Sequence, residues 1–166
     1  MSESPQDNQS RQSTSMPRVT RIIPPVYFGI GLAAIIALSW IKPWMRLPDV
    51  PGLAALGFLL FVAGLVMVWF CARLFRAAET PIKPFHATTT LLCKGPYAYS
   101  RNPIYAAGIA SLLGAALMAG TLSALLVVVV FALLMHYAFV LSEEAVLSET
   151  LGDEYQDYCS RVRRWL

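Results

Sequence analysis

The chain has 166 residues, of which 57% are hydrophobic and 14% are charged. Soluble domains carry about 25% charged residues, so this composition excludes an ordinary soluble domain and favours one membrane-embedded bundle. The net charge of +3 does not indicate a nucleic-acid-binding surface, because the basic residues cluster at the ends of apolar segments. Cys71, Cys93 and Cys159 are far apart without CxxC spacing, which predicts free thiols and no metal site.

The N-terminal part of the chain divides into a polar tail and a first apolar run. Residues 1–18 are rich in Ser and Gln, which predicts a disordered tail before a single domain over residues 19–166. The run 22–41 is about one membrane thickness long, and Pro24 falls at its first turn, where a missing N–H costs least. A signal peptide is the alternative, although this run is longer than a usual apolar core of about 7–15 residues.

Three further spans are predicted over residues 53–72, 104–118 and 122–141. The segment 73–103 is too polar for the hydrocarbon core and too long for a simple turn, so we expect it to be functional or to contain structure. The turn 119–121 joins the last two spans. Small residues predict close helix packing on the third span: Gly108, Ala110, Ser111, Gly114 and Ala115. Together these features predict an all-α membrane bundle of about four transmembrane helices.

The last two spans form a hairpin with polar residues at both ends. Between Arg101 and Glu143 lie 41 residues without a formal charge, enough to cross a bilayer and return, since one span needs about 20. The segment GPYAYSRNPIY (95–105) and the pair Glu143–Glu144 should therefore form one polar site at one membrane face. Seven-residue spacing also predicts that His136 shares a helix face with Glu143.

The tail 143–166 predicts two short amphipathic helices. Gly152 should end the first, and Asp153 with Gln156 has the spacing of a capping box for the second. An apolar stripe follows helical spacing: Leu147, Leu151, Tyr155, Tyr158, Val162 and Trp165. The stripe is explained either by packing within the protein or by binding to a membrane surface, where Arg161, Arg163 and Arg164 would meet anionic headgroups.

The distribution of charge predicts the orientation. With four spans, the N-terminus, the segment 73–103 and the tail lie on one side, together with eleven of the thirteen Lys and Arg residues. Cytoplasmic loops are enriched in these residues, so we expect the polar site to face the cytoplasm.

The residue types at this site suit a small zwitterion with an additional positive centre. Carboxylates can hold an ammonium group, Arg101 can hold a carboxylate, and the faces of Tyr97, Tyr99 and Tyr105 attract cations. S-adenosylmethionine has these groups and an adenine that can stack. The alternative is that the tyrosines and Arg101 form only an interfacial belt.

The order GPYxxxRxPxY, apolar hairpin, EE and LGxxYxxYxxxVRRW resembles the integral-membrane methyltransferases related to isoprenylcysteine carboxyl methyltransferase and the phospholipid methyltransferases. The resemblance covers about residues 73–165. It implies S-adenosylmethionine as cofactor and a lipophilic or lipid-linked substrate within the membrane. It implies cofactor contacts from these residues: Thr89, Thr90, Leu91, Leu92, Tyr97, Asn102, Pro103, Ile104, Tyr105 and Glu144. Arg101 and Glu143 then lie nearest the acceptor and are the expected catalytic residues.

Two positions depart from this family. Many relatives have His at the position of Asn102, and Asn cannot take up a proton near neutral pH. The eukaryotic isoprenylcysteine enzymes have an Arg where this chain has Phe139, and a Phe cannot pair with a substrate carboxylate. The acceptor therefore stays open among carboxylates, thiols, amines and other groups, as does the oligomeric state.

Two other functions remain as alternatives. A membrane reductase of the steroid 5α-reductase kind would use NADPH, with Arg161, Arg163 and Arg164 available for a 2′-phosphate. A non-catalytic four-span protein that binds lipid or a partner would also fit the small-residue face and the basic tail. It would not require Tyr97, Arg101 and the two glutamates at one membrane face.

Overall fold

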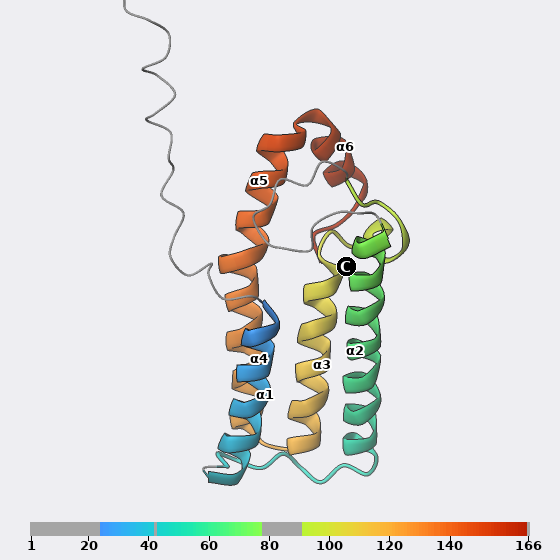
Figure 1. Ribbon diagram of the computed structural model, residues 1–166. Helices are drawn as coiled ribbons and strands as arrows, with labels where there is room; N and C mark the ends of the chain where they lie inside the picture. Colours follow the sequence, from blue (N-terminus) through green and yellow to red (C-terminus); the bar gives the residue numbers. More distant parts are fainter. Residues whose placement is uncertain (1–23, 42, 78–90, 166) are drawn as a thin grey trace, which may run out of the picture.

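The computed structural model describes residues 24–41, 43–77 and 91–165, and the predicted polar tail 1–18 lies outside them. The helices are α1 (Pro24–Ile41), α2 (Leu53–Ala77), the 3-10 helix η3 (Gly95–Ala98), α3 (Pro103–Ala119), α4 (Leu122–Leu134), the π-helical η4 (Met135–Val140), α5 (Leu141–Leu151) and α6 (Asp153–Arg161). They form an elongated bundle (Figure 1). Within the described ranges, β-pairing is limited to two isolated bridges. The predicted all-α class is confirmed.

Three helices are long and apolar enough to cross a membrane: Pro24–Ile41, Leu53–Ala77 and the continuous stretch Leu122–Leu151. The fourth, α3, is apolar but has 17 residues, the lower end of what spans a bilayer. Helix α2 continues five residues past the predicted end at 72. The guanidinium carbon of Arg73, in this added part of the helix, lies 5.0 Å from the ring centroid of Trp69. This cation–π contact stabilises the charged side chain beside the apolar span.

The last span and the first tail helix form one rod, which corrects the prediction of two separate elements. Helices α4, η4 and α5 run without interruption from Leu122 to Leu151. The reason is visible in the sequence, because this stretch contains no Gly or Pro that would end a helix. At about 1.5 Å per residue, 30 residues make a rod of about 45 Å.

The π-helical turn in this rod changes which residues share a face. A π turn advances less per residue than an α turn, so residues after it are rotated relative to α-helical spacing. His136 lies within the turn, with its ring near those of Tyr137 and Trp165, whereas Glu143 bonds to Tyr105 of α3. No hydrogen bond or ion pair joins His136 and Glu143 among the described residues, so the seven-residue spacing does not place them in polar contact.

Glycines allow α2 and α3 to pack in close contact. The only described residues of α2 that are buried are Gly57, Gly64 and Cys71, which are seven residues apart and face α3. A Cβ added to Gly114 would lie 2.4 Å from the carbonyl oxygen of Gly57. Ser111 donates a hydrogen bond to the carbonyl of Phe61. The predicted small-residue face is thus used at Ser111 and Gly114, whereas a Cβ at Gly108 would meet no atom within 4 Å.

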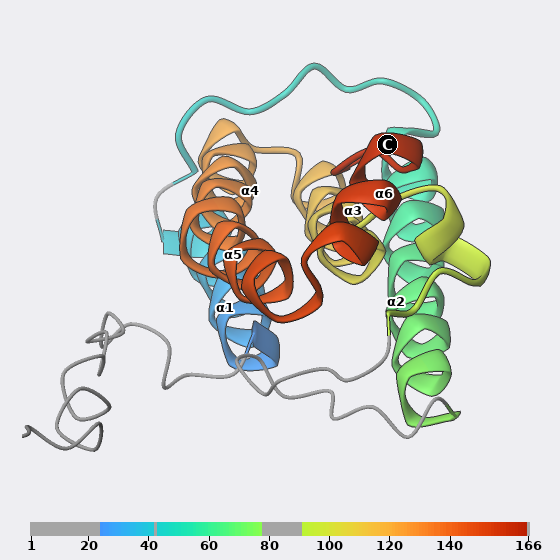
Figure 2. The same cartoon turned by 90° about the horizontal axis from the view of Figure 1, so that it is seen from above.

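The main core lies between α1, α3 and the α4–η4 rod. Figure 2 shows α1 beside α4, with α3 and α2 on the other side and α6 above α3. Fully or almost fully buried core residues are Ile35, Leu112, Ala116, Ala124, Met135, Phe139 and Val140. Helix α1 contributes to this core through Ile35 and through Phe28, whose ring packs edge-on against Phe131. Helix α1 is therefore part of the bundle in this structure.

The connections that reverse the chain depend on a few residues. Gly120 adopts a left-handed conformation (φ 61°), and Thr121 caps α4 by accepting from the backbone N–H of Ala124. Gly152 (φ 50°) ends α5 as predicted. The capping box at Asp153 is not formed, because Gly152 already occupies the N-cap position and its carbonyl accepts from the N–H of Gln156.

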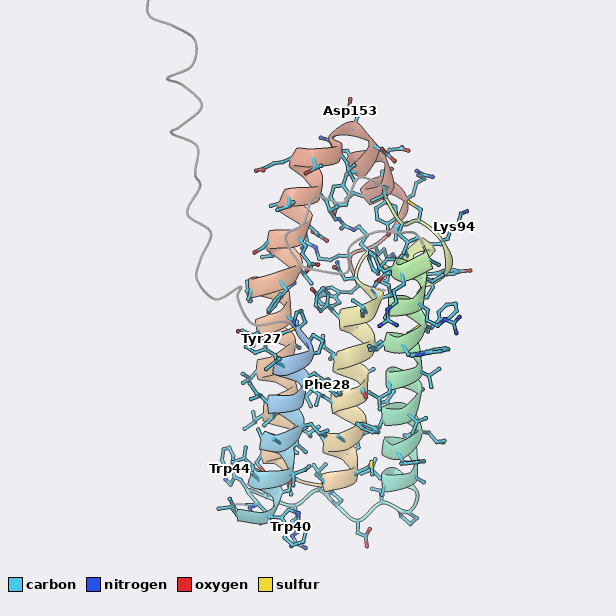
Figure 3. All side chains as sticks on the ribbon, in the orientation of Figure 1. Tyr27, Phe28, Trp40, Trp44, Lys94 and Asp153 are labelled. Atoms are coloured by element: carbon cyan, nitrogen blue, oxygen red, sulfur yellow. The ribbon has the colours of Figure 1, made fainter. Side chains whose placement is uncertain are left out.

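Aromatic residues mark the two ends of the apolar bundle. Trp40 and Trp44 are exposed at one end of the bundle (Figure 3). The C-terminal helices lie at the other end, together with Lys94 and Asp153. Near the other boundary, Trp69 and Tyr137 are exposed about 24 and 22 Å along their helices from Leu53 and Leu122, at 1.5 Å per residue. Exposed Trp and Tyr prefer the membrane–water interface. Glu143 follows Tyr137 by six residues along the same rod.

Candidate active site

The segment between α2 and α3 is shaped by proline and glycine. Gly95 has φ 62° and begins the 3-10 helix η3 with Pro96 at its first turn. Asn102 is the N-cap residue of α3 and Pro103 is its first residue, as the sequence predicts. This geometry brings residues 97–105 to the end of the bundle that the α4–α5 rod also reaches.

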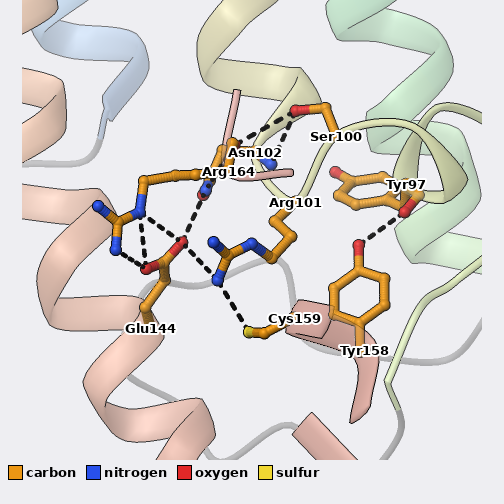
Figure 4. Close-up of polar contacts among 8 residues, drawn as sticks. All are labelled: Tyr97, Ser100, Arg101, Asn102, Glu144, Tyr158, Cys159 and Arg164. Carbon is orange, nitrogen blue, oxygen red and sulfur yellow. Dashed lines mark hydrogen bonds and ion pairs between the residues drawn. The ribbon is translucent and has the colours of Figure 1, made fainter. Parts of the chain in front are cut away.

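Glu144 is the centre of a cluster of polar side chains (Figure 4). Its Oε2 atom lies 2.8 Å from Nη2 of Arg164, and Nε of the same arginine donates to both carboxylate oxygens at 3.2 and 3.0 Å. Nη1 of Arg101 lies 3.4 Å from Oε1. Nδ2 of Asn102 donates to Oε1 at 3.3 Å. The Glu144 side chain is 11% exposed, so two cations and an amide hold a nearly buried carboxylate.

Glu143 has a different environment from its neighbour. Its Oε1 atom accepts a 2.6 Å hydrogen bond from the hydroxyl of Tyr105 in α3. Neither arginine of the Glu144 cluster pairs with it in the described part of the chain. The two adjacent glutamates are thus separated in role, one tied to arginines and the other to a neutral hydroxyl.

The C-terminal segment 162–165 docks on the turn before α3. The N–H of Arg101 donates to the carbonyl of Arg163 at 2.9 Å, and Ser100 and Arg163 form a parallel bridge. Nδ2 of Asn102 and the hydroxyl of Ser100 donate to the carbonyl of Arg164, at 3.2 and 3.4 Å. The backbone of this segment is therefore held independently of the Arg164 guanidinium.

Arg101 is shared between Glu144 and helix α6. Its Nη1 atom donates to Sγ of Cys159 at 2.8 Å, and the Tyr155 hydroxyl is another polar neighbour. Burial by itself would lower the pKa of Arg101, but the Glu144 carboxylate and the Tyr155 hydroxyl outweigh burial and raise this pKa above its ordinary value. Arg101 is a permanent cation in this site.

Tyr97 is packed into the protein and does not touch the carboxylates. Its ring lies edge-on to Phe75, with centroids 5.2 Å apart, and its hydroxyl is buried near the thiol of Cys71 without a hydrogen bond of ordinary geometry. Its carbonyl accepts a 2.6 Å bond from the hydroxyl of Tyr158 in α6. Burial raises the pKa of the Tyr158 hydroxyl, which keeps it a donor. Helix α6 is thereby tied to η3.

We expect Tyr158→Phe to lower the free energy of unfolding by about 1–3 kcal/mol, because the Tyr97 carbonyl loses its buried donor. Tyr99→Phe is the matched control, since Tyr99 is 80% exposed and should tolerate the change. Thermal unfolding of both variants in detergent, followed by circular dichroism, tests the difference. Equal unfolding temperatures for the two variants would contradict this role of Tyr158.

The structure places the remaining predicted residues as follows. Leu91 packs against the cluster of Tyr155, Tyr158 and Val162, and Leu92 is half-buried. Pro103 and Ile104 form the first turn of α3. Thr89 and Thr90 lie outside the described residues. Phe139, at the departure from the family pattern, is fully buried between the rings of Tyr27 and Tyr105.

Sequence reasoning missed three groups at this site. Arg164 is predicted to be available to lipid headgroups or to a 2′-phosphate, and in the structure it pairs with Glu144. Tyr158 was placed on an apolar stripe, and its hydroxyl holds the backbone of η3. Cys159 accepts from Arg101. The quoted pattern YxxYxxxVRRW contains Tyr158 and Arg164, but helical spacing alone does not show which side chains turn inward.

Taken together, the geometry defines a helical membrane protein with a charged site where the α2–α3 connection meets the end of the α4–α5 rod. The model of the phospholipid methyltransferase family matches residues 53–154, and the chain belongs to this family. No curated protein and no solved structure matches the chain. The matched residues include both halves of the site, and family membership supports a membrane methyltransferase in general.

Proposed function

We propose that the protein is an S-adenosylmethionine-dependent methyltransferase that acts on a lipophilic acceptor, similar to isoprenylcysteine carboxyl methyltransferase. The observation that supports this most is the contact of the RNPIY turn with both glutamates, through Asn102 to Glu144 and Tyr105 to Glu143. These contacts occur at one end of a membrane bundle, in a chain that belongs to a methyltransferase family.

The residues present fit this cofactor by their chemistry. Its methionine end carries an ammonium and a carboxylate, and the Glu144 cluster offers a carboxylate beside guanidinium groups. Asn102, Glu144 and the residues near Leu91 would hold the cofactor. When bound, the cofactor supplies an electrophilic methyl group on a sulfonium. Tyr97 supports the site through packing, since its ring lies against that of Phe75 in α2.

The chain's own contribution to the reaction is positioning, which can supply about 7–11 kcal/mol of the barrier. Glu143 is placed on the acceptor side, where its carboxylate can orient an acceptor or take a proton from an amine. Tyr105 fixes this carboxylate by a hydrogen bond. A carboxylate or thiolate acceptor would need no proton removal. Arg101 is held by Glu144 and Cys159 and would stabilise negative charge on such an acceptor.

The depth of the site supports a lipid-linked acceptor. The α4–α5 rod is about 45 Å long, against about 30 Å of hydrocarbon, so its last turns project beyond the apolar core. Glu143 and Glu144 are on this projecting part, beyond exposed Tyr137. The excess of Lys and Arg at this end supports a cytoplasmic orientation.

The reductase alternative has no support from the comparison with known families, since the chain belongs to a methyltransferase family. Binding of NADPH by the purified protein, without binding of S-adenosylhomocysteine, would restore that alternative. If Tyr97, Arg101, Glu143 and Glu144 all tolerate Ala without loss of function, a non-catalytic role would be favoured.

Isothermal titration with S-adenosylhomocysteine tests the proposal directly. We expect the wild type to bind and Glu144→Gln to bind about tenfold or more weakly, because a charge-assisted contact is lost. Glu149→Gln is the matched control, since Glu149 is exposed on the same helix and outside the cluster. An unfolding curve for Glu144→Gln distinguishes loss of binding from loss of fold. Absence of binding by the wild type would end the proposal.

A further inference from the structure

The Glu144 cluster has an excess of one positive charge. Two guanidinium groups, from Arg101 and Arg164, face one carboxylate. Arg101 and Glu144 are only 15% and 11% exposed, and an incompletely balanced charge in such a place is costly. Glu143 does not compensate the excess through a contact with either arginine among the described residues. The carboxylate of a ligand would therefore be attracted to these two arginines.

Each of the two arginines also has an N–H group without a hydrogen-bond acceptor among the described residues. Arg164 uses Nε and Nη2 on Glu144, and Arg101 uses Nη1 on Glu144 and Cys159. Nε of Arg101 is buried without an acceptor, and the described part of the chain provides none for Nη1 of Arg164. Arg164 is the most exposed member of the cluster at 39%, so its unused donor is accessible to a ligand.

We propose that Arg164 binds the amino-acid carboxylate of S-adenosylmethionine, while Glu144 takes the ammonium group. This inference rests on the proposed function and adds a binding residue and an orientation to it. In this arrangement the ammonium group of the ligand meets the Glu144 carboxylate, and the carboxylate of the ligand meets the Arg164 guanidinium, which has an N–H group without an acceptor in the described part of the chain. The carboxylate-to-guanidinium geometry allows two parallel hydrogen bonds.

The backbone contacts of the segment 162–165 make this testable. The carbonyls of Arg163 and Arg164 hold the segment on the turn, so Arg164→Gln should leave it docked. The decisive pair of ligands is S-adenosylmethionine and its decarboxylated form, which keeps the ammonium and the sulfonium but lacks the carboxylate. Titration of both ligands is performed on the full chain in detergent or nanodiscs.

We expect Arg164→Gln to weaken binding of S-adenosylmethionine about tenfold or more, since a charge-assisted contact to its carboxylate is lost. Binding of the decarboxylated ligand should be unchanged or tighter, because Glu144 loses a competing cation. Arg161→Gln is the control for removal of a positive charge from the same region, since Arg161 pairs with exposed Asp157 and with no other acidic residue of the described ranges. Arg164→Lys keeps the charge without the planar guanidinium and should fall between wild type and Arg164→Gln.

Other results would overturn the inference. Equal losses for the two ligands in Arg164→Gln and Arg164→Lys would show that Arg164 only maintains the structure, and no loss for either would show that it does not meet the ligand. Equal affinity of the wild type for both ligands would also refute it while leaving the proposed function intact. A wild type that binds neither ligand would refute the proposed function and this inference with it.

Discussion

Replacement of Gly114 with alanine is expected to destabilise the protein by about 3 kcal/mol or more. An added Cβ would lie 2.4 Å from the carbonyl oxygen of Gly57 and 2.5 Å from the backbone nitrogen of Phe61. Both atoms belong to the backbone of α2, so no change of rotamer can relieve the overlap. The two helices must separate, and the turn that carries Asn102 and Tyr105 moves with α3.

Gly108→Ala is the matched control in the same helix. Its added Cβ would meet no atom within 4 Å, and alanine is favoured over glycine inside a helix by about 1 kcal/mol. Thermal unfolding in detergent should therefore show a lower midpoint for Gly114→Ala and an equal or higher one for Gly108→Ala. If the two variants unfold alike, the close contact between α2 and α3 is not a determinant of stability.

The second large effect is expected on catalysis. Glu143→Gln should reduce transfer of labelled methyl groups to membrane lipid by about 10²-fold or more if the acceptor must lose a proton. S-adenosylhomocysteine should bind within about twofold of the wild type, because Glu143 is bonded to Tyr105 and is not part of the Glu144 cluster. Glutamine can still accept from the Tyr105 hydroxyl, so the packing is preserved while the charge is lost.

The assay combines the protein, lipid extract and methyl-labelled cofactor, with mass spectrometry of the products. Glu149→Gln serves as the exposed control on the same rod. Undiminished transfer by Glu143→Gln would exclude Glu143 as a proton acceptor and would favour an acceptor that is already anionic. A parallel loss of cofactor binding would instead place Glu143 on the cofactor side.

The architecture could be predicted from the sequence because its determinants are local. Apolar runs and prolines define the spans, and Asn102–Pro103 begins α3 where expected. The union of the last span with the first tail helix was not foreseen, because the charges at Glu143 and Glu144 suggested the end of a span. No Gly or Pro interrupts the backbone before Gly152, so the helix continues past the two glutamates.

The site was only partly predictable for a different reason. The proximity of Asn102 and Tyr105 to the two glutamates was predictable, because the length of the apolar hairpin returns both of its ends to one face of the membrane. The position of Arg164 depends on how the segment after α6 docks, through backbone bonds to Ser100 and Arg101. Such pairing between residues about 60 positions apart has no local periodic pattern. The rotation of His136 away from the helix face of Glu143 likewise depends on a π-helical turn.

The length of the α4–α5 rod has an energetic consequence for a lipid acceptor. Each methylene that leaves hydrocarbon for water costs about 0.8 kcal/mol, so raising an acyl or prenyl chain by several carbons would cost several kcal/mol. The rod places Glu143 about 9 Å, or six residues, beyond Tyr137. A headgroup can reach that height while its chain remains dissolved in the bilayer. Encounter with the site then requires diffusion in the plane of the membrane and no extraction from it.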